Sequence, residues 1–135
     1  MTVLIQQRIR AAAPNLFRAG PTSPYQRVSI TVPDGWEKPL MKLVRTLEEI
    51  ITKTGHDIEV HQIKSKFGKL RFYIGKIHPE IYNDTYNAIL EAEVECAGAC
   101  EVCGNHGFAR TGRWINTLCD DHALGREVLD ANLFI

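Results

Sequence analysis

Hydrophobic residues recur every three or four positions between Pro39 and Gly55, which is the spacing that places them on one face of an α-helix. The members of this stripe are Leu40, Leu43, Val44, Leu47, Ile50 and Ile51. Pro39 suits the first turn of a helix, and Gly55 suits the position just past its end. The pattern therefore predicts an amphipathic helix over this segment.

The period changes to strict alternation in residues 56–76, on both sides of Phe67-Gly68-Lys69. The apolar positions are Ile58 and Val60 before this turn, and Leu70, Phe72 and Ile74 after it. Alternation with period two predicts a β-hairpin. If the apolar set faces the core, Arg71 and Tyr73 face the opposite side of the hairpin.

Helical spacing returns after Pro79 and predicts a second long helix that leads toward Cys100. Its expected apolar face consists of Tyr82, Tyr86, Ile89, Leu90 and Val94. Prolines punctuate residues 14–33, which predicts mostly loop with a short strand at RVSITV, residues 27–32. The resulting fold class is α+β, with a core built from a helix, a β-hairpin and a helix.

The four cysteines and two of the five histidines fall between Cys96 and His122. Cys100-x2-Cys103 and Cys119-x2-His122 form two ligand pairs separated by fifteen residues, which is typical of zinc sites. Four protein ligands close the coordination shell, so the expected role of Zn²⁺ is structural. His106 is an alternative fourth ligand, and Cys96 is expected to be a small buried side chain.

The residues around these pairs predict a treble-clef-like order of knuckle, hairpin and ligand-bearing helix. Gly104 suits the knuckle, and a hairpin turning at Thr111-Gly112 follows it. The expected small core of this module is Phe108, Trp114, Ile115 and Leu118. Leu124, Val128, Leu129 and Leu133 recur at helical spacing, which would place Cys119 and His122 in the first turn of a final helix.

A length of 135 residues, 44% of them hydrophobic and 24% charged, is typical of one globular domain. We expect a core with a loop-rich N-terminal segment in residues 1–98 and a zinc module in residues 99–135 packed on it. No apolar run is long enough for a membrane span, and Arg8 and Arg10 interrupt any signal-peptide core. We therefore expect the cytosol as the compartment, where free thiols and metal thiolates persist longer than disulfides.

The formal net charge is zero, but the charges are arranged in blocks along the chain. The hairpin is basic and lacks acids between residues 62 and 76, whereas residues 80–101 carry acids and no base. The favoured interpretation is that these blocks form solvated faces that neutralise each other across the fold. Alternatively, basic residues interleaved with aromatic ones can contact phosphates and stack on bases. The candidate nucleic-acid-binding residues are Lys64, Lys66, Lys69 and Arg71 of this hairpin and Arg110 and Arg113 of the zinc module.

Several short motifs occur together in this chain. They are PNLF near the N-terminus, DGW at residues 34–36, KFGKLRFY at residues 66–73, an Ala-Glu pair at residues 92–93 and CEVCG...GRWINTLCDDH at residues 100–122. This combination resembles a family of small proteins from bacteriophages, prophages and bacterial genomes. The resemblance implies that Cys100, Cys103, Cys119 and His122 are metal ligands and suggests a phage-type setting. Lys69, where a glycine is common, and Cys96 depart from the family pattern.

The chain contains none of the common catalytic motifs, so we expect a protein that is not an enzyme. His56, His61 and His78 flank the hairpin, where histidines usually cap elements or are exposed. The favoured function is binding to a bacterial host protein, which the chain would modulate or inhibit through Phe67, Arg71, Tyr73 and Trp114. The alternative is a nucleic-acid-binding regulator that uses the basic hairpin and the zinc module.

Overall fold

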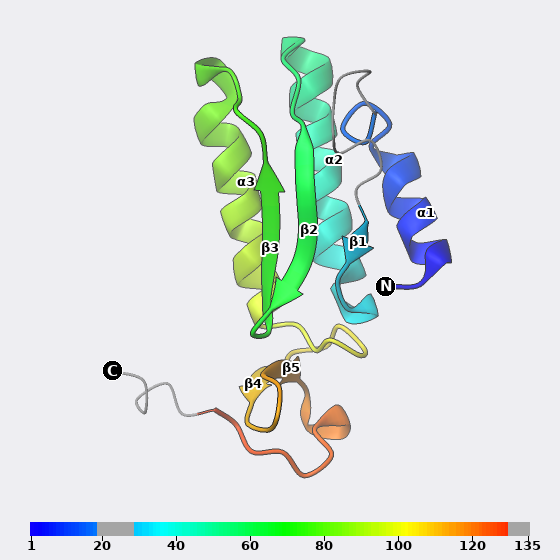
Figure 1. Ribbon diagram of the computed structural model, residues 1–135, viewed down its shortest axis with the longest axis vertical. Helices are drawn as coiled ribbons and strands as arrows, with labels where there is room; N and C mark the ends of the chain where they lie inside the picture. Colours follow the sequence, from blue (N-terminus) through cyan, green and yellow to red (C-terminus); the bar gives the residue numbers. More distant parts are fainter. Residues whose placement is uncertain (19–28, 130–135) are drawn as a thin grey trace.

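The structure is a computed structural model that describes residues 1–18 and 29–129. A three-stranded sheet lies against α-helices, and a small module with a second, two-stranded sheet lies below it (Figure 1). The described elements are α1 (Val3–Ala12), β1 (Ile30–Thr31), α2 (Glu37–Thr54), β2 (Val60–Lys66), β3 (Lys69–Ile74), α3 (Pro79–Ala97), β4 (Phe108–Arg110) and β5 (Asn116–Leu118), with 3₁₀ turns at Asp34–Trp36 and Asp120–His122. The predicted α+β class is therefore confirmed.

Helix α2 is the central helix of the core. It buries five members of the predicted stripe, Leu40, Leu43, Val44, Leu47 and Ile51. Gly55 ends the helix with a φ of 77° and donates its N–H to the Ile51 carbonyl at 2.9 Å. A left-handed backbone conformation costs glycine less free energy than any other residue. Glycine at this position is therefore a reliable sequence signal for the end of a helix. The predicted helix is confirmed.

Strands β2 and β3 form the predicted hairpin, and β1 pairs with β2 in the parallel sense, so the strand order is β1-β2-β3. The turn residues Phe67 and Gly68 both have positive φ, 55° and 73°. Positive φ at both central residues is the mark of a type I′ turn, whose twist matches that of the strands. Leu70 and Phe72 are buried, as the alternation predicts.

Helix α3 begins at the predicted place but turns a different face to the core. It buries Ile81, Thr85, Ile89, Ala92 and Cys96. Of the predicted apolar face only Ile89 is buried, and Tyr82, Tyr86, Leu90 and Val94 are exposed. The prediction was wrong here because the face that contacts α2 and β3 contains small residues, which allow close packing but carry little hydrophobic signal.

Helix α1 and its connection to α2 were not predicted from the sequence. Ile9 is fully buried against the core, although most of the other α1 side chains are at least partly exposed. Thr2 caps the helix by accepting the Ile5 N–H, and Arg8 forms an ion pair with Glu37 of α2. The Glu48 carboxylate accepts the backbone N–H of Leu16 at 2.9 Å. Such long-range polar contacts cannot be read from a local pattern.

Candidate functional site

The four predicted metal ligands lie together in the lower module. Cys100 and Cys103 lie on the loop that follows α3, Cys119 follows β5, and His122 ends the 3₁₀ turn. The Cys103 and Cys119 sulfurs are 3.7 Å apart, and His122 Nδ1 is 3.2 Å from Cys119 Sγ and 3.7 Å from Cys100 Sγ. A disulfide needs a sulfur separation of about 2 Å, so these are free thiols. The cluster can hold a metal ion.

Backbone hydrogen bonds shape the loop that carries Cys100 and Cys103. The Gly104 N–H donates to the Cys100 carbonyl at 2.8 Å, and the Cys100 N–H donates to the Asn105 carbonyl at 2.7 Å. The φ of 81° at Gly104 closes this loop, as its sequence position predicts. The alternative ligand His106 is exposed and packs edge-on against Phe108 instead of joining the cluster.

The electrostatics of the cluster favour a bound cation. Burial raises the pKa of Cys100, but backbone N–H groups of Cys119, Cys103 and Val102 outweigh it and lower this pKa to about 6. The Asn105 N–H lowers the pKa of Cys103. Burial and the neighbouring thiols of Cys119 and Cys100 together outweigh this contact, so the pKa of Cys103 is raised. Neighbouring thiolates repel one another, and a metal cation at their centre would remove that repulsion.

The expected final helix is absent from the described residues. After the 3₁₀ turn, Leu124 and Gly125 both have positive φ, 50° and 78°, and this reverses the chain. Val128 then forms a β-bridge with Arg110. Leu133, the last residue of the predicted stripe, lies outside the described residues. The apolar spacing misled because a helix cannot pass through two consecutive left-handed residues.

The expected apolar core of the lower module is also largely wrong. Leu118 is buried, but Ile115 is only partly buried, and Phe108 and Trp114 are 46% and 72% exposed. The interior instead contains Arg110, which is 5% exposed and donates to the Leu118 carbonyl at 3.1 Å and to Asp120 at 2.9 Å. Arg110 therefore supports the fold of the module and is not available as a nucleic-acid contact.

Two glycine-containing motifs join the lower module to the core. Gly35 of the DGW motif donates its N–H to the Glu101 carbonyl at 2.9 Å, and Trp36 Nε1 donates to the Ala99 carbonyl at 3.0 Å. A Cβ atom on Gly35 would overlap the Cys100 carbonyl. At the hairpin turn, the Gly68 carbonyl accepts the Thr117 hydroxyl at 3.1 Å. The sequence shows these motifs, but their docking role is visible only in the structure.

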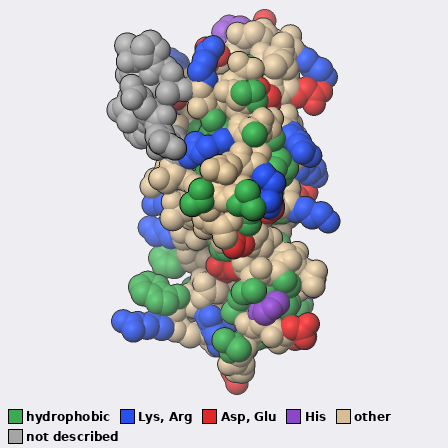
Figure 2. Space-filling view, turned by 90° about the vertical axis from the view of Figure 1, so that its right-hand side faces the viewer, with side chains coloured by type: hydrophobic (Ala, Val, Ile, Leu, Met, Phe, Trp, Pro, Cys, Tyr) green, Lys and Arg blue, Asp and Glu red, His purple; other side chains and the backbone are tan. Residues whose placement is uncertain are grey.

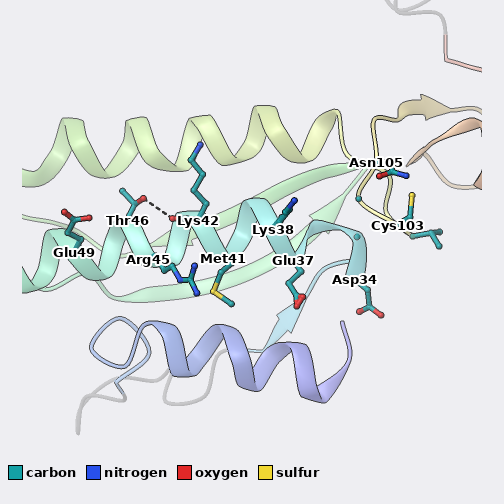
Figure 3. Close-up of a pocket in the computed structure, with 13 residues that line it drawn as sticks. Asp34, Glu37, Lys38, Met41, Lys42, Arg45, Thr46, Glu49, Cys103 and Asn105 are labelled. Carbon is teal, nitrogen blue, oxygen red and sulfur yellow. Dashed lines mark hydrogen bonds between the residues drawn. The ribbon is translucent and has the colours of Figure 1, made fainter.

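A groove of about 720 Å³ runs along α2 and ends beside Cys103 and Asn105 (Figure 3). Its charged side chains have both signs. Lys42 is paired with Glu91 at 2.6 Å and with Glu95 at 2.8 Å, and this contact holds the pKa of Glu91 below its usual value. Lys38 and Arg45 also line the groove. The mixture of charges does not define one class of ligand, and no sequence signal pointed to this groove.

The outer face of the β2–β3 hairpin, turned away from α2 and α3, carries the basic residues predicted from the sequence. The strand register places Lys64 opposite Arg71 and Lys66 opposite Lys69, with Gln62 opposite Tyr73. Within the described residues, none of these four cations takes part in an ion pair. Figure 2 views the molecule from the side of α1, so the outer face of the hairpin is seen edge-on at its left margin, where Lys and Arg side chains project.

Of the residues predicted to contact a partner, Phe67 and Tyr73 are exposed at the turn and on the outer face, at 62% and 46%. Arg71 lies between them in the register and is partly buried. Trp114 and Arg113 are exposed in the loop between β4 and β5. Two acids of the block in residues 80–101, Glu91 and Glu95, pair with Lys42 of α2 and not with the hairpin.

Comparison of the chain with protein-family models, with curated proteins and with solved structures finds no match. Among the described helices, none combines the length and apolar character that crossing a membrane requires. The functional argument therefore rests on the residues themselves.

Proposed function

We propose that this protein is a non-enzymatic, zinc-stabilised module that binds nucleic acid through the outer face of the β2–β3 hairpin. Zinc is the ion that best suits three cysteine sulfurs and one histidine nitrogen. A tetrahedron with Zn–S bonds of about 2.3 Å has sulfur atoms about 3.8 Å apart. The 3.7 Å between Cys103 Sγ and Cys119 Sγ supports this assignment.

The observation that carries the ligand assignment is the pairing of like charges across the hairpin. Lys64 opposite Arg71 and Lys66 opposite Lys69 place four cations on neighbouring strands. Like charges directly opposite each other destabilise a sheet, so this arrangement costs stability unless an anion covers it. A chain of phosphates is the anion that several aligned cations suit best, because each contact releases a condensed counterion.

The aromatic residues at the two ends of this face favour single-stranded nucleic acid. Phe67 is 62% exposed at the turn, and Tyr73 is 46% exposed two residues beyond Arg71. Exposed aromatic rings stack on unpaired bases, which are inaccessible in a duplex. Lys66 Nζ lies 5.4 Å from the Phe67 ring centroid, so a cation and a stacking surface are adjacent.

Fluorescence anisotropy with a labelled single-stranded oligonucleotide tests the proposal. Four phosphate contacts predict that the logarithm of the binding constant falls with the logarithm of salt concentration with a slope of about −3. The double variant Lys64→Glu/Arg71→Glu should weaken binding by about tenfold or more at low salt. The control Lys38→Glu/Arg45→Glu makes the same change in net charge at the groove on α2, and its binding should stay much closer to that of the unmodified protein.

Two results would contradict nucleic-acid binding at this face. One is the absence of salt-sensitive binding at low ionic strength, and the other is an equal loss in both double variants. Circular dichroism of each variant checks that the fold is retained. Since these side chains are exposed or only partly buried, we expect no change in the spectrum.

A second candidate is a bacterial host protein bound by Phe67, Arg71, Tyr73 and Trp114. The observation in its favour is the 72% exposure of Trp114, because exposed aromatic residues and arginine are enriched among interface residues with large energetic contributions. In this case Tyr73→Ala and Trp114→Ala should abolish capture of one protein from bacterial lysate while metal content stays unchanged. Trp114→Ala tested with oligonucleotide separates the two functions, because Trp114 lies outside the β2–β3 hairpin and its loss should leave oligonucleotide binding unchanged.

A further inference from the structure

A second cluster of metal-ligand side chains lies at the opposite end of the molecule from the four-ligand site. It consists of His56, which follows the end of α2, and His78 and Glu80 at the start of α3. Figure 1 shows these two helix ends together at the top, far from β4 and β5. The proposed function uses none of these residues.

The His56 side chain contacts both of the other side chains. His56 Nε2 is 2.9 Å from Glu80 Oε2, and the imidazole rings of His56 and His78 are stacked, with centroids 3.8 Å apart and an interplanar angle of 9°. One potential ligand atom from each residue lies within 4.8 Å of the other two. The expectation that these histidines cap elements or are exposed is correct for His78, which accepts the Glu80 N–H at 3.1 Å.

The backbone on both sides holds the cluster in place. Gly55 fixes the direction in which the chain leaves α2, and Pro79 fixes the first turn of α3. His56 and Glu80 are 24 residues apart in the chain but meet because α2 and α3 pack side by side. The two helices therefore present imidazole and carboxylate groups to one point without any rearrangement of the backbone.

We infer that His56, His78 and Glu80 form a second binding site for a divalent transition-metal ion. Two imidazoles with one carboxylate suit Zn²⁺, Co²⁺ or Ni²⁺, and they exclude a site specialised for Ca²⁺ or Mg²⁺, which prefer oxygen ligands. With three protein ligands, the remaining coordination positions are open to water, in line with the 73% exposure of the Glu80 side chain.

Binding requires two local changes. The stacked rings must separate, because two imidazoles that bind one ion cannot both point at it while they lie parallel and in contact. His78 must also give up its bond to the Glu80 N–H, since Nδ1 is the acceptor and the neutral ring then carries its proton on Nε2. These costs make the second site weaker than the four-ligand site, which needs no such exchange.

The test is a titration of zinc into protein that already carries one zinc per chain, with the binding heat measured by isothermal titration calorimetry. We expect a second equivalent with micromolar affinity and a higher melting temperature in its presence. The variant His78→Asn keeps a side chain that can cap α3 but removes the imidazole, and Glu80→Gln keeps the shape but removes the charge. Each should weaken the second event at least about tenfold and leave the first zinc in place.

The matched control is His106→Ala, which removes an exposed histidine elsewhere and should bind the second zinc normally. The inference is overturned if the unmodified protein takes up no second zinc at millimolar concentration. It is equally overturned if His78→Asn and Glu80→Gln bind it within about twofold of the unmodified protein. Because zinc binding is the readout, these results do not depend on the nucleic-acid proposal.

Discussion

Gly35 lies where the backbone of the core meets the backbone of the loop that carries Cys100 and Cys103. Its N–H donates to the Glu101 carbonyl, and its Cα faces the Cys100 carbonyl so closely that no side chain fits between them. Trp36, the next residue, is fully buried and donates to the Ala99 carbonyl. Two adjacent residues thus hold the loop that carries Cys100 and Cys103 against the core.

We predict that Gly35→Ala lowers the free energy of unfolding by about 2 kcal/mol, because the added methyl group forces the two backbones apart. Metal affinity should fall as well, because the added methyl group would displace the backbone of Cys100, one of the four candidate ligands. The control is Gly98→Ala, where the added Cβ finds open space apart from the Glu95 carbonyl at 3.9 Å. Urea unfolding and a competition assay with a chelator measure the two effects. Equal stability of both variants would contradict the docking role of Gly35.

Cys96 shows how a residue of a chemically active type can be structurally inert. Its side chain is fully buried, and burial, aided by the charges of Glu95 and Glu93, raises the pKa of the thiol to about 12. The thiol therefore stays neutral at physiological pH and packs as a small apolar group, as its sequence position suggested.

At the scale of the element, the hydrophobicity of a side chain in α3 does not predict whether that side chain is buried. Its buried face contains Thr85, Ala92 and Cys96, whereas Leu90 and Val94 are 58% and 66% exposed. The helix packs against both α2 and β3, so small side chains on the contact face allow the close approach. Ile81 and Ile89 are buried on the same face, whereas Leu90 and Val94 are left on the outside.

Two neighbouring leucine-sized residues of α3 test this orientation. Ile89→Ala should lower the free energy of unfolding by about 2–4 kcal/mol, because it leaves a cavity in the core. Leu90→Ala, at an exposed position, should change it by less than about 0.5 kcal/mol. Chemical denaturation of the two variants measures both values. A larger effect at Leu90 would show that the face predicted from hydropathy is the buried one.

At the scale of the whole molecule, the core and the lower module are stabilised in different ways. The core contains a large cluster of buried apolar side chains from all three helices and the sheet. Among its described residues, the module has a much smaller buried cluster, Cys100, Leu118 and Cys119, two of which belong to the group that can hold a metal ion. With so little apolar burial among the described residues, we expect the module to depend on a bound metal for its fold.

Removal of the metal should therefore affect the two parts unequally. A strong chelator, or Cys119→Ser, should abolish the dispersed amide resonances of residues 99–129 in NMR spectra and lower the melting temperature. Helical circular dichroism should largely persist, because α1, α2 and α3 belong to the core. The control Cys96→Ala removes a cysteine that is not a ligand and should retain the metal. Unchanged module resonances after complete chelation would contradict a structural role for the metal.

The sequence alone determined the features that depend on local chemistry. The period of apolar residues and Gly55 defined α2, alternation around Phe67-Gly68 defined the hairpin, and cysteine spacing identified the four side chains that cluster in the structure. Each of these signals lies within a few residues of the feature it predicts, because backbone conformation and ligand spacing are local properties.

Only the tertiary structure decided which surfaces meet. It buried the face of α3 that includes Ala92 and Cys96, reversed the chain at Leu124-Gly125 where a helix was expected, and placed Arg110 where an apolar core was expected. It also brought His56 to Glu80. These outcomes depend on contacts between residues far apart in the chain, whose energies no local pattern contains, so the face a segment buries is set by its neighbours in space.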